Sequence, residues 1–144
     1  MKEQNFKNHV RLIPGYHGVT FFAITVALVL AAVMLFRAID NNVSIQLPVI
    51  LMLICFSIIS MMFYCRGFAL RAQDRAIRAE ENFRHFILTG SPLDQRLRMG
   101  QIIALRFASD DEFVALAKKA VDENLDGKTI KQSIQHWRAD HHRA

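Results

Sequence analysis

Two uncharged apolar stretches, residues 18–36 (GVTFFAITVALVLAAVMLF) and residues 43–65 (VSIQLPVILMLICFSIISMMFYC), decide the fold of this chain. They are 19 and 23 residues long, and both exceed the length of about 18 apolar residues that predicts a transmembrane helix. Neither stretch has the polar face that a buried helix of a soluble protein carries. We therefore predict two membrane spans, at about residues 18–38 and 43–65.

A cleaved signal peptide is the alternative explanation for the first stretch. Signal peptides have an apolar core of about 7–15 residues and then a cleavage site with small residues. The first stretch is longer than that and is followed, after only six residues, by the second stretch. We therefore expect an uncleaved anchor. The short link, residues 37–42, predicts two antiparallel neighbouring helices, with a turn at Asp40, Asn41 and Asn42.

Lysine and arginine residues near the spans predict the orientation, because these residues are enriched on the cytoplasmic side. The link between the spans carries only Arg37, which Asp40 offsets. The cations on the two flanks that face the chain termini are Lys2, Lys7, Arg11, Arg66, Arg71, Arg75 and Arg78. We expect these cations at the membrane surface and both termini in the cytoplasm. Residues 1–17 are expected to form a basic amphipathic flank.

The composition argues against several classes of protein. Of the 144 residues, 52% are hydrophobic and 22% are charged, and nearly all charges lie before residue 12 or after residue 65. This distribution is unlike that of a large enzyme core, a secreted disulfide scaffold or a disordered chain. The tail, residues 66–144, mixes cations with anions, so no nucleic acid partner is expected. Neither span has a charge in its middle, which counts against an ion channel or an ion-coupled transporter.

Small and apolar residues form two regular rows. In the first span Ala23, Ala27 and Ala31 recur every four residues, a spacing that lets helix backbones approach closely. This row predicts either packing between the two spans or dimerisation between chains. After the second span a row with steps of three and four forms a heptad pattern, the 69–86 seam: Ala69, Ala72, Ala76, Ala79, Phe83 and Phe86. The seam predicts either packing against later helices of the same chain or a parallel coiled coil between chains.

The tail is expected to be helical throughout. The second span is predicted to continue to about residue 88, and three short amphipathic helices follow. The first covers residues 92–108, the second begins with a capping box formed by Ser109 and Glu112, and the last is capped by Thr129. The fold class is therefore all-α: a two-helix transmembrane hairpin (residues 18–65) followed by a small cytoplasmic helical bundle (residues 66–144). The residues expected to pack this bundle or to dock a partner are Phe83, Phe86, Phe107, Phe113 and Trp137.

The only candidates for metal chemistry lie at the end of the chain. His136 and Asp140 are four positions apart on the expected last helix, a spacing that places two ligands on one face, and His141 would be a third ligand. A solvated polar face is the competing interpretation, and it is the one we adopt. The chain has no phosphate-binding loop, nucleophile elbow or dinucleotide fingerprint, so neither a catalytic residue nor a cofactor is expected.

Three stretches resemble a family of small bacterial two-span membrane proteins that is known as a domain of unknown function. They are residues 4–17 (QNFKNHVRLIPGYH), 101–113 (QIIALRFASDDEF) and 130–144 (IKQSIQHWRADHHRA). The resemblance covers nearly the whole chain. It implies location in the bacterial inner membrane, and it implies no activity and no functional residue.

These observations predict a membrane-anchored helical interaction or structural module. In this hypothesis the spans hold the tail near the membrane, and the tail binds a partner or another copy of the chain. One alternative is a small accessory subunit of a membrane transporter, which would use the Ala23 row to contact the larger protein. Another is a metal or pH sensor based on the terminal histidines. The expected partners are the lipid bilayer and either a homo-oligomer or a larger membrane protein.

Overall fold

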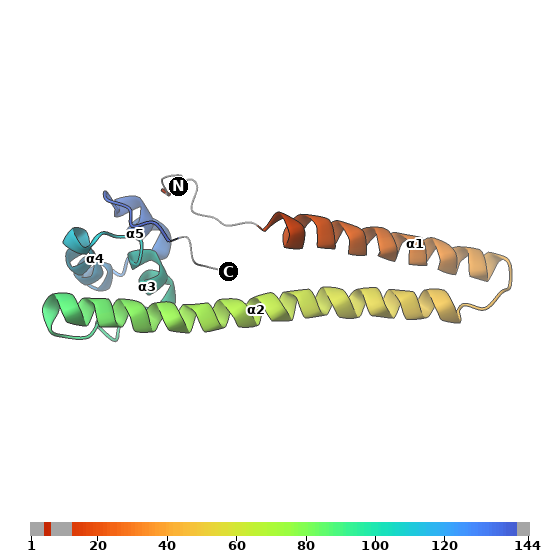
Figure 1. Ribbon diagram of the computed structural model, residues 1–144, viewed down its shortest axis with the longest axis horizontal. Coiled ribbons are helices and arrows are strands. Elements are labelled where there is room, and N and C mark those ends of the chain that lie inside the picture. Colours follow the sequence, from red (N-terminus) through yellow and green to blue (C-terminus); the bar gives the residue numbers. More distant parts are fainter. Residues whose placement is uncertain (1–4, 7–12, 141–144) are drawn as a thin grey trace. The chain divides into compact units, whose positions relative to one another are not determined.

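The computed structural model of the chain describes residues 5–6 and 13–140, and its elements are helices (Figure 1). In chain order they are the π-helix η1 (Gly15–Thr20), α1 (Phe21–Asp40), α2 (Gln46–Thr89), α3 (Met99–Leu105), α4 (Asp110–Asp122) and α5 (Gly127–Ser133). The described residues contain no strand, and only an isolated antiparallel bridge joins Ala108 to Trp137. The chain divides into two compact units, one within Arg11–Phe68 and the other containing Ala69–Ala144. The prediction of an all-helical fold is confirmed.

The first unit contains the two apolar stretches. The helical segments Gly15–Asp40 and Gln46–Thr89 are long and apolar enough to cross a membrane, judged by length and composition. Asn41 and Asn42 lie in the predicted turn between them. The Asn41 side chain donates to the carbonyl of Arg37 at 2.8 Å, and Asn42 has a φ of 53°. Pro48 lies in the first turn of α2, where its missing N–H disturbs no helical hydrogen bond.

Within this unit α1 has one buried face. Its buried residues, Ile24, Ala31 and Ala38, are seven positions apart, so they lie along one side of the helix. The hydroxyl of Tyr16 donates to the backbone carbonyl of Met62, which places the start of the first helical segment beside the middle of α2. Most other large apolar side chains of this unit are exposed, which agrees with helical segments long and apolar enough to cross a membrane.

The second unit has a compact core of its own. Figure 1 shows α3, α4 and α5 gathered beside the C-terminal part of α2. The largest fully buried side chains are Phe107, Phe113, Leu105 and Ile130. The buried Gln101 amide donates to the carbonyls of Ala120 and Leu125, at 3.1 and 2.8 Å. These two bonds join α3 to the C-terminal end of α4 without leaving the amide nitrogen unsatisfied.

The predicted helix over residues 92–108 is wrong in its first half, because α3 begins only at Met99. Gly90, with a φ of 74°, ends α2 as expected for a helix C-terminus. The chain then runs on without helix. The N–H of Leu93 donates to the Asn82 side chain at 2.9 Å, a long-range bond that holds this segment against α2. Gln101 instead marks the helix start, since its side chain accepts from the N–H of Arg98 at 2.7 Å.

The predicted capping box at the start of α4 is also wrong. Ser109 is the N-cap residue, but its hydroxyl makes no capping bond and is buried without a hydrogen-bond partner in the described part of the chain. The Glu112 carboxylate accepts instead from the N–H groups of Gln135 and His136, at 3.1 and 3.0 Å. The N–H of Ser109 donates to the carbonyl of His136 at 3.1 Å. Ser109 and Glu112, the two residues expected to cap the helix, therefore bind the C-terminal segment instead.

The last helix is shorter than predicted and begins earlier. Asp126, rather than Thr129, is its N-cap, and the Asp126 carboxylate accepts from the N–H of Thr129 at 2.7 Å. α5 ends at Ser133, so Trp137 lies outside the helix, with its ring centroid 5.0 Å from that of Phe107. At the start of α5, a Cβ atom on Gly127 would lie 2.9 Å from the carbonyl oxygen of Gly100. The absence of a side chain at Gly127 therefore permits the close approach of α3 and α5.

Candidate interaction surface on helix α2

The C-terminal part of α2 has two different faces. One face carries the buried residues Ile77 and Glu81 and the half-buried Arg84, which contact the helices of the second unit. Steps of four and three between these residues place them on one side of the helix. This face is the one that fixes the short helices to α2.

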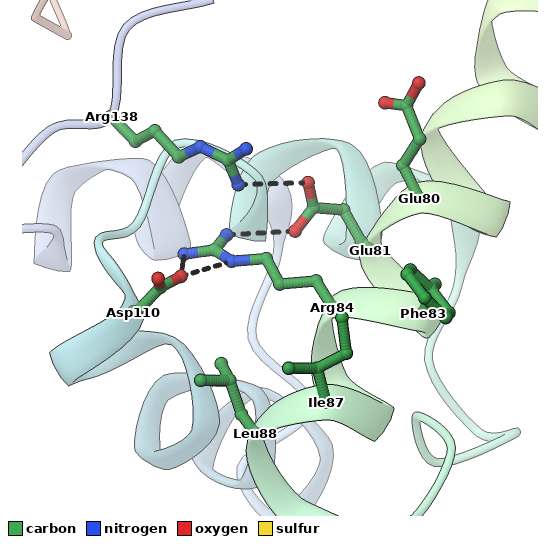
Figure 2. A pocket seen from close by; sticks show the side chains of 8 residues that line it. All are labelled: Glu80, Glu81, Phe83, Arg84, Ile87, Leu88, Asp110 and Arg138. Atoms are coloured by element: carbon green, nitrogen blue, oxygen red, sulfur yellow. Dashed lines mark hydrogen bonds and ion pairs between the residues drawn. The ribbon is translucent and has the colours of Figure 1, made fainter.

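A cluster of charged side chains occupies this face (Figure 2). We refer to Glu81, Arg84, Asp110 and Arg138 as the Arg84 cluster. Arg84 bonds Glu81 at 3.0 Å with Nη1 and Asp110 at 2.6 Å with Nε, and it donates to the carbonyl of Ala108 at 2.8 Å with Nη2. Arg138 lies 3.9 Å from the other oxygen of Glu81. The four charges thus come from α2, from the start of α4 and from the C-terminal segment.

The geometry of the Arg84 cluster indicates a structural role. The Arg84 side chain is 10% exposed, and its guanidinium lies 4.3 Å from the centroid of the Phe113 ring, so it also contributes a cation–π contact. A groove of about 470 Å³ lies beside the cluster and is also lined by Phe83, Ile87 and Leu88. The two arginines offset the two carboxylates, so the cluster has no surplus charge with which to recognise an ionic ligand. None of these four residues was predicted to belong to a site, although the i,i+3 spacing of Glu81 and Arg84 was a visible signal.

The other face of α2 carries the 69–86 seam, and it is exposed. All six seam residues are exposed, including Phe83 and Phe86 at 65% and 53%. Ile87, next to the seam, is 66% exposed. The alternative in which the seam packs against later helices of the same chain is therefore wrong, because those helices contact the side of α2 that carries Ile77, Glu81 and Arg84. Exposed phenylalanine side chains in a row are unusual for a solvated helix surface.

The three other aromatic residues predicted to pack or dock lie in the core. Phe107 and Phe113 are fully buried. Trp137 is partly buried and packs against the same core. These three residues hold the second unit together, whereas Phe83 and Phe86 remain on the surface. The five residues therefore divide between two roles.

The small-residue row of the first span is divided as well. Ala31 is buried, whereas Ala23 and Ala27 are exposed. The buried face of α1 consists of Ile24, Ala31 and Ala38, so it shares only Ala31 with the predicted row. Ala23 and Ala27 therefore lie outside the contact that α1 makes within this unit.

The terminal residues proposed as metal ligands do not share a helix. His136 and Asp140 both follow the end of α5 at Ser133, so the i,i+4 argument does not apply. Asp140 instead pairs with the buried Arg106 at 3.0 Å. His141 lies outside the described residues. Among the residues that the structure describes, no group of three histidine, cysteine or carboxylate side chains is placed to hold a metal ion.

Of the seven predicted surface cations, the four that follow the second span lie on α2. Arg71, Arg75 and Arg78 are exposed, whereas Lys2, Lys7 and Arg11 lie outside the described residues. Arg66 is half-buried and lines a cavity of about 300 Å³ that is otherwise mostly apolar, together with Tyr16, His17, Phe21, Ile59, Met62 and Phe63.

Two exposed carboxylates outside these surfaces have shifted pKa values. The hydrogen bond from the Arg96 side chain lowers the pKa of Asp94 from 3.8 to about 2, and the same pair raises the pKa of Arg96. Hydrogen bonds from Thr129 lower the pKa of Asp126, the N-cap residue of α5. Both carboxylates stabilise local turns through these hydrogen bonds.

Comparisons with known proteins identify the family and no activity. No curated protein and no solved structure matches the chain. A family model, described as a family of unknown function (DUF6526), matches residues 1–144. The predicted resemblance to a family without an assigned function is confirmed in this respect, and the chain belongs to the DUF6526 family.

Proposed function

We propose that the protein is a membrane-anchored helical interaction module of the bacterial inner membrane. The two apolar helical segments would form a transmembrane hairpin with both termini in the cytoplasm. The helical tail would then lie at the inner membrane surface and bind a partner there. The basic flanks and the nearly uncharged link between the spans support this orientation.

The observation that carries this proposal is that the two parts of α2 differ in composition and in which of their faces are covered. The helix begins as an apolar segment with the composition of a span and continues, without a break, into a charged segment. On that second segment one face is covered by the chain's own helices, and the opposite face displays an uncovered row with two aromatic side chains. A helix that is anchored at one end and exposes apolar residues at the other is suited to present a docking surface near the membrane.

Extraction and topology experiments on the full chain test the anchoring. We expect the protein to remain in the membrane pellet after alkaline extraction. A reporter that is active only in the cytoplasm should be active when it is fused after residue 144. It should be inactive when inserted between Asn41 and Asn42. Release by alkaline extraction, or activity of the reporter at the link, would contradict the proposal.

A second function, an accessory subunit of a larger membrane protein, is supported by the exposed positions of Ala23 and Ala27 on α1. Two small residues at this spacing allow a helix of another protein to approach closely. We expect Ala27→Phe to abolish co-purification with such a protein. The matched control is Val29→Phe, an exposed position on the same helix but off the row. Equal recovery with both variants would argue against this role.

A further inference from the structure

We infer that the 69–86 seam is the contact surface for a second copy of this chain, which pairs with it as a parallel two-stranded coiled coil. The inference rests on the proposed membrane anchoring and identifies the partner of the surface described above. The seam extends over 18 residues, or about 27 Å of helix. It would place four alanines and two phenylalanines of each copy at the core positions a and d.

The heptad positions explain why the seam is open. With Ala69 at position a, the residues that contact the chain's own helices fall at the outer positions b, c and f: Ile77 and Arg84 at b, His85 at c, and Glu81 at f. In a coiled coil, b, c and f point away from the core formed by a and d. The second unit therefore covers the outer side of α2 and leaves the full a/d row uncovered. α2 can therefore contact the chain's own short helices on one side and α2 of a second copy along the seam at the same time.

The charges beside the seam specify a like copy in parallel orientation. Positions g and e flank the core, and in a parallel dimer each g residue faces the e residue five positions later in the partner helix. Arg75 occupies a g position, and Glu80 occupies the e position five residues later. Two identical Arg–Glu pairs would therefore form across the dimer. Both side chains are exposed, and neither makes an ion pair within the described part of the chain.

An antiparallel pair of the same helices lacks this attraction. In that arrangement g residues face g residues, and e residues face e residues. The g residues are Phe68, Arg75 and Asn82, and the e residues are Gln73, Glu80 and Ile87. No register of an antiparallel pair therefore brings opposite charges together. Two copies anchored in one membrane with the same topology also have parallel α2 helices, so anchoring and charge pattern favour the same arrangement.

The side chains in the seam fit such a contact. Alanine at positions 69, 72, 76 and 79 lets the two backbones approach closely next to the membrane. Phe83 and Phe86 would bury their exposed rings against the same residues of the second copy. Ile87, at the flanking position e, would cover the edge of this aromatic layer. The pairing removes from water the apolar surface that the monomer leaves uncovered.

Disulfide trapping in native membranes tests the pairing directly. In a background with Cys55→Ala and Cys65→Ala, single cysteines are introduced by Ala76→Cys and Ala79→Cys. The matched control is Arg78→Cys, an exposed position c on the same turn. After mild oxidation we expect both seam variants to give a covalent species with the mass of two chains, at least about tenfold more abundant than with the control. Equal yields, no trapped species, or an adduct of another mass would overturn the inference.

A charge exchange tests the orientation. Association of two differently labelled full-length copies is measured by energy transfer in lipid vesicles. We expect Arg75→Glu and Glu80→Arg each to weaken association by roughly tenfold, because each change turns two attractive pairs into repulsive ones. The double variant, which restores opposite charges across the dimer, should return to within about threefold of the original chain. Failure of the double variant to recover would overturn the parallel arrangement.

The same samples separate this inference from the proposed anchoring. A chain that resists alkaline extraction but gives no seam-specific disulfide overturns the pairing and leaves the anchoring in place. A chain that alkaline extraction releases, but that still forms the seam-specific species, overturns the anchoring and supports the pairing.

Discussion

Replacing Arg84 by methionine should destabilise the second unit strongly. The change removes the guanidinium that pairs with Glu81 and Asp110 and donates to the Ala108 carbonyl. Within the described part of the chain, the Glu81 side chain, 7% exposed, would keep only the Arg138 contact at 3.9 Å. Breaking a buried ion pair by removing one member costs about 3–5 kcal/mol, because the other charge stays buried.

The expected loss is at the lower end of that range. Arg138 still compensates part of the Glu81 charge, the Asp110 side chain is 65% exposed, and methionine keeps part of the contact with Phe113. Bonds to an exposed carboxylate contribute little. We therefore expect a decrease in the free energy of unfolding of about 3 kcal/mol. For a unit of this size, that corresponds to a fall in Tm of roughly 12–24 °C.

The fluorescence of Trp137 is a specific assay for this unit. It is the only tryptophan of the chain, and its ring packs against Phe107 in the core. Thermal or urea unfolding of the full chain in detergent, followed at this residue, reports on the second unit without interference from the spans. The matched control is Arg78→Met, on an exposed position of the same helix, which should change the free energy by less than about 0.5 kcal/mol.

The paired variant Glu81→Leu with Arg84→Met guards against the case in which the single variant does not fold. Replacing both partners of a buried pair by apolar residues is often nearly neutral. We expect the double variant to be more stable than the Arg84→Met variant. A loss below about 1 kcal/mol for Arg84→Met, or a double variant less stable than this single one, would refute the assigned role of the cluster.

Three further outcomes are expected from the same Trp137 assay. Gly127→Ala should destabilise the unit by about 1–3 kcal/mol, because its Cβ would meet the Gly100 carbonyl at 2.9 Å and force a backbone shift; an unchanged Tm would contradict this close contact. Ser109→Ala should be neutral or raise stability by about 1 kcal/mol, since the buried hydroxyl makes no hydrogen bond in the described part of the chain; a loss of 1 kcal/mol would indicate a capping role. The lowered pKa of Asp94, about 2 when folded against 3.8, gives a stabilisation that is present above pH 4 and lost as the pH falls from about 4 to 2. Asp94→Asn should flatten this part of the pH profile, and an unchanged profile would show that the Arg96 pair contributes nothing.

The regular features of the fold could be predicted from local sequence. Uncharged stretches of sufficient length predicted the two apolar helices, and an amphipathic helix was correctly predicted to begin at Ser109, the N-cap of α4. The end of α2, predicted at about residue 88, lies at Thr89. These predictions depend on residues within one or two turns of each other, which a sequence displays directly.

The helix starts that were predicted wrongly depend on distant groups. Asn82 accepts from Leu93 across eleven positions and holds the segment after α2 in a non-helical conformation. Glu112 has the spacing of a capping residue, but its carboxylate binds backbone groups more than twenty positions later. The same limit applies to the candidate surface. The 69–86 seam was visible in the sequence. Which face of α2 the tail would cover depended on residues that are distant in the chain, because Asp110 pairs with Arg84 and Arg138 lies near Glu81.

The contacts between α2 and the chain's own short helices affect how strongly two chains associate through the seam. Residues 69–89 are held in a helix by contacts on the Ile77 and Glu81 side before a second chain arrives. Ordering a free segment costs about 1–2 kcal/mol per residue. Binding through the seam would not have to meet that cost, so the strength of pairing and the stability of the second unit are thermodynamically linked. A change deep in the core, at Phe107 or Phe113, would then weaken an interface that it never touches.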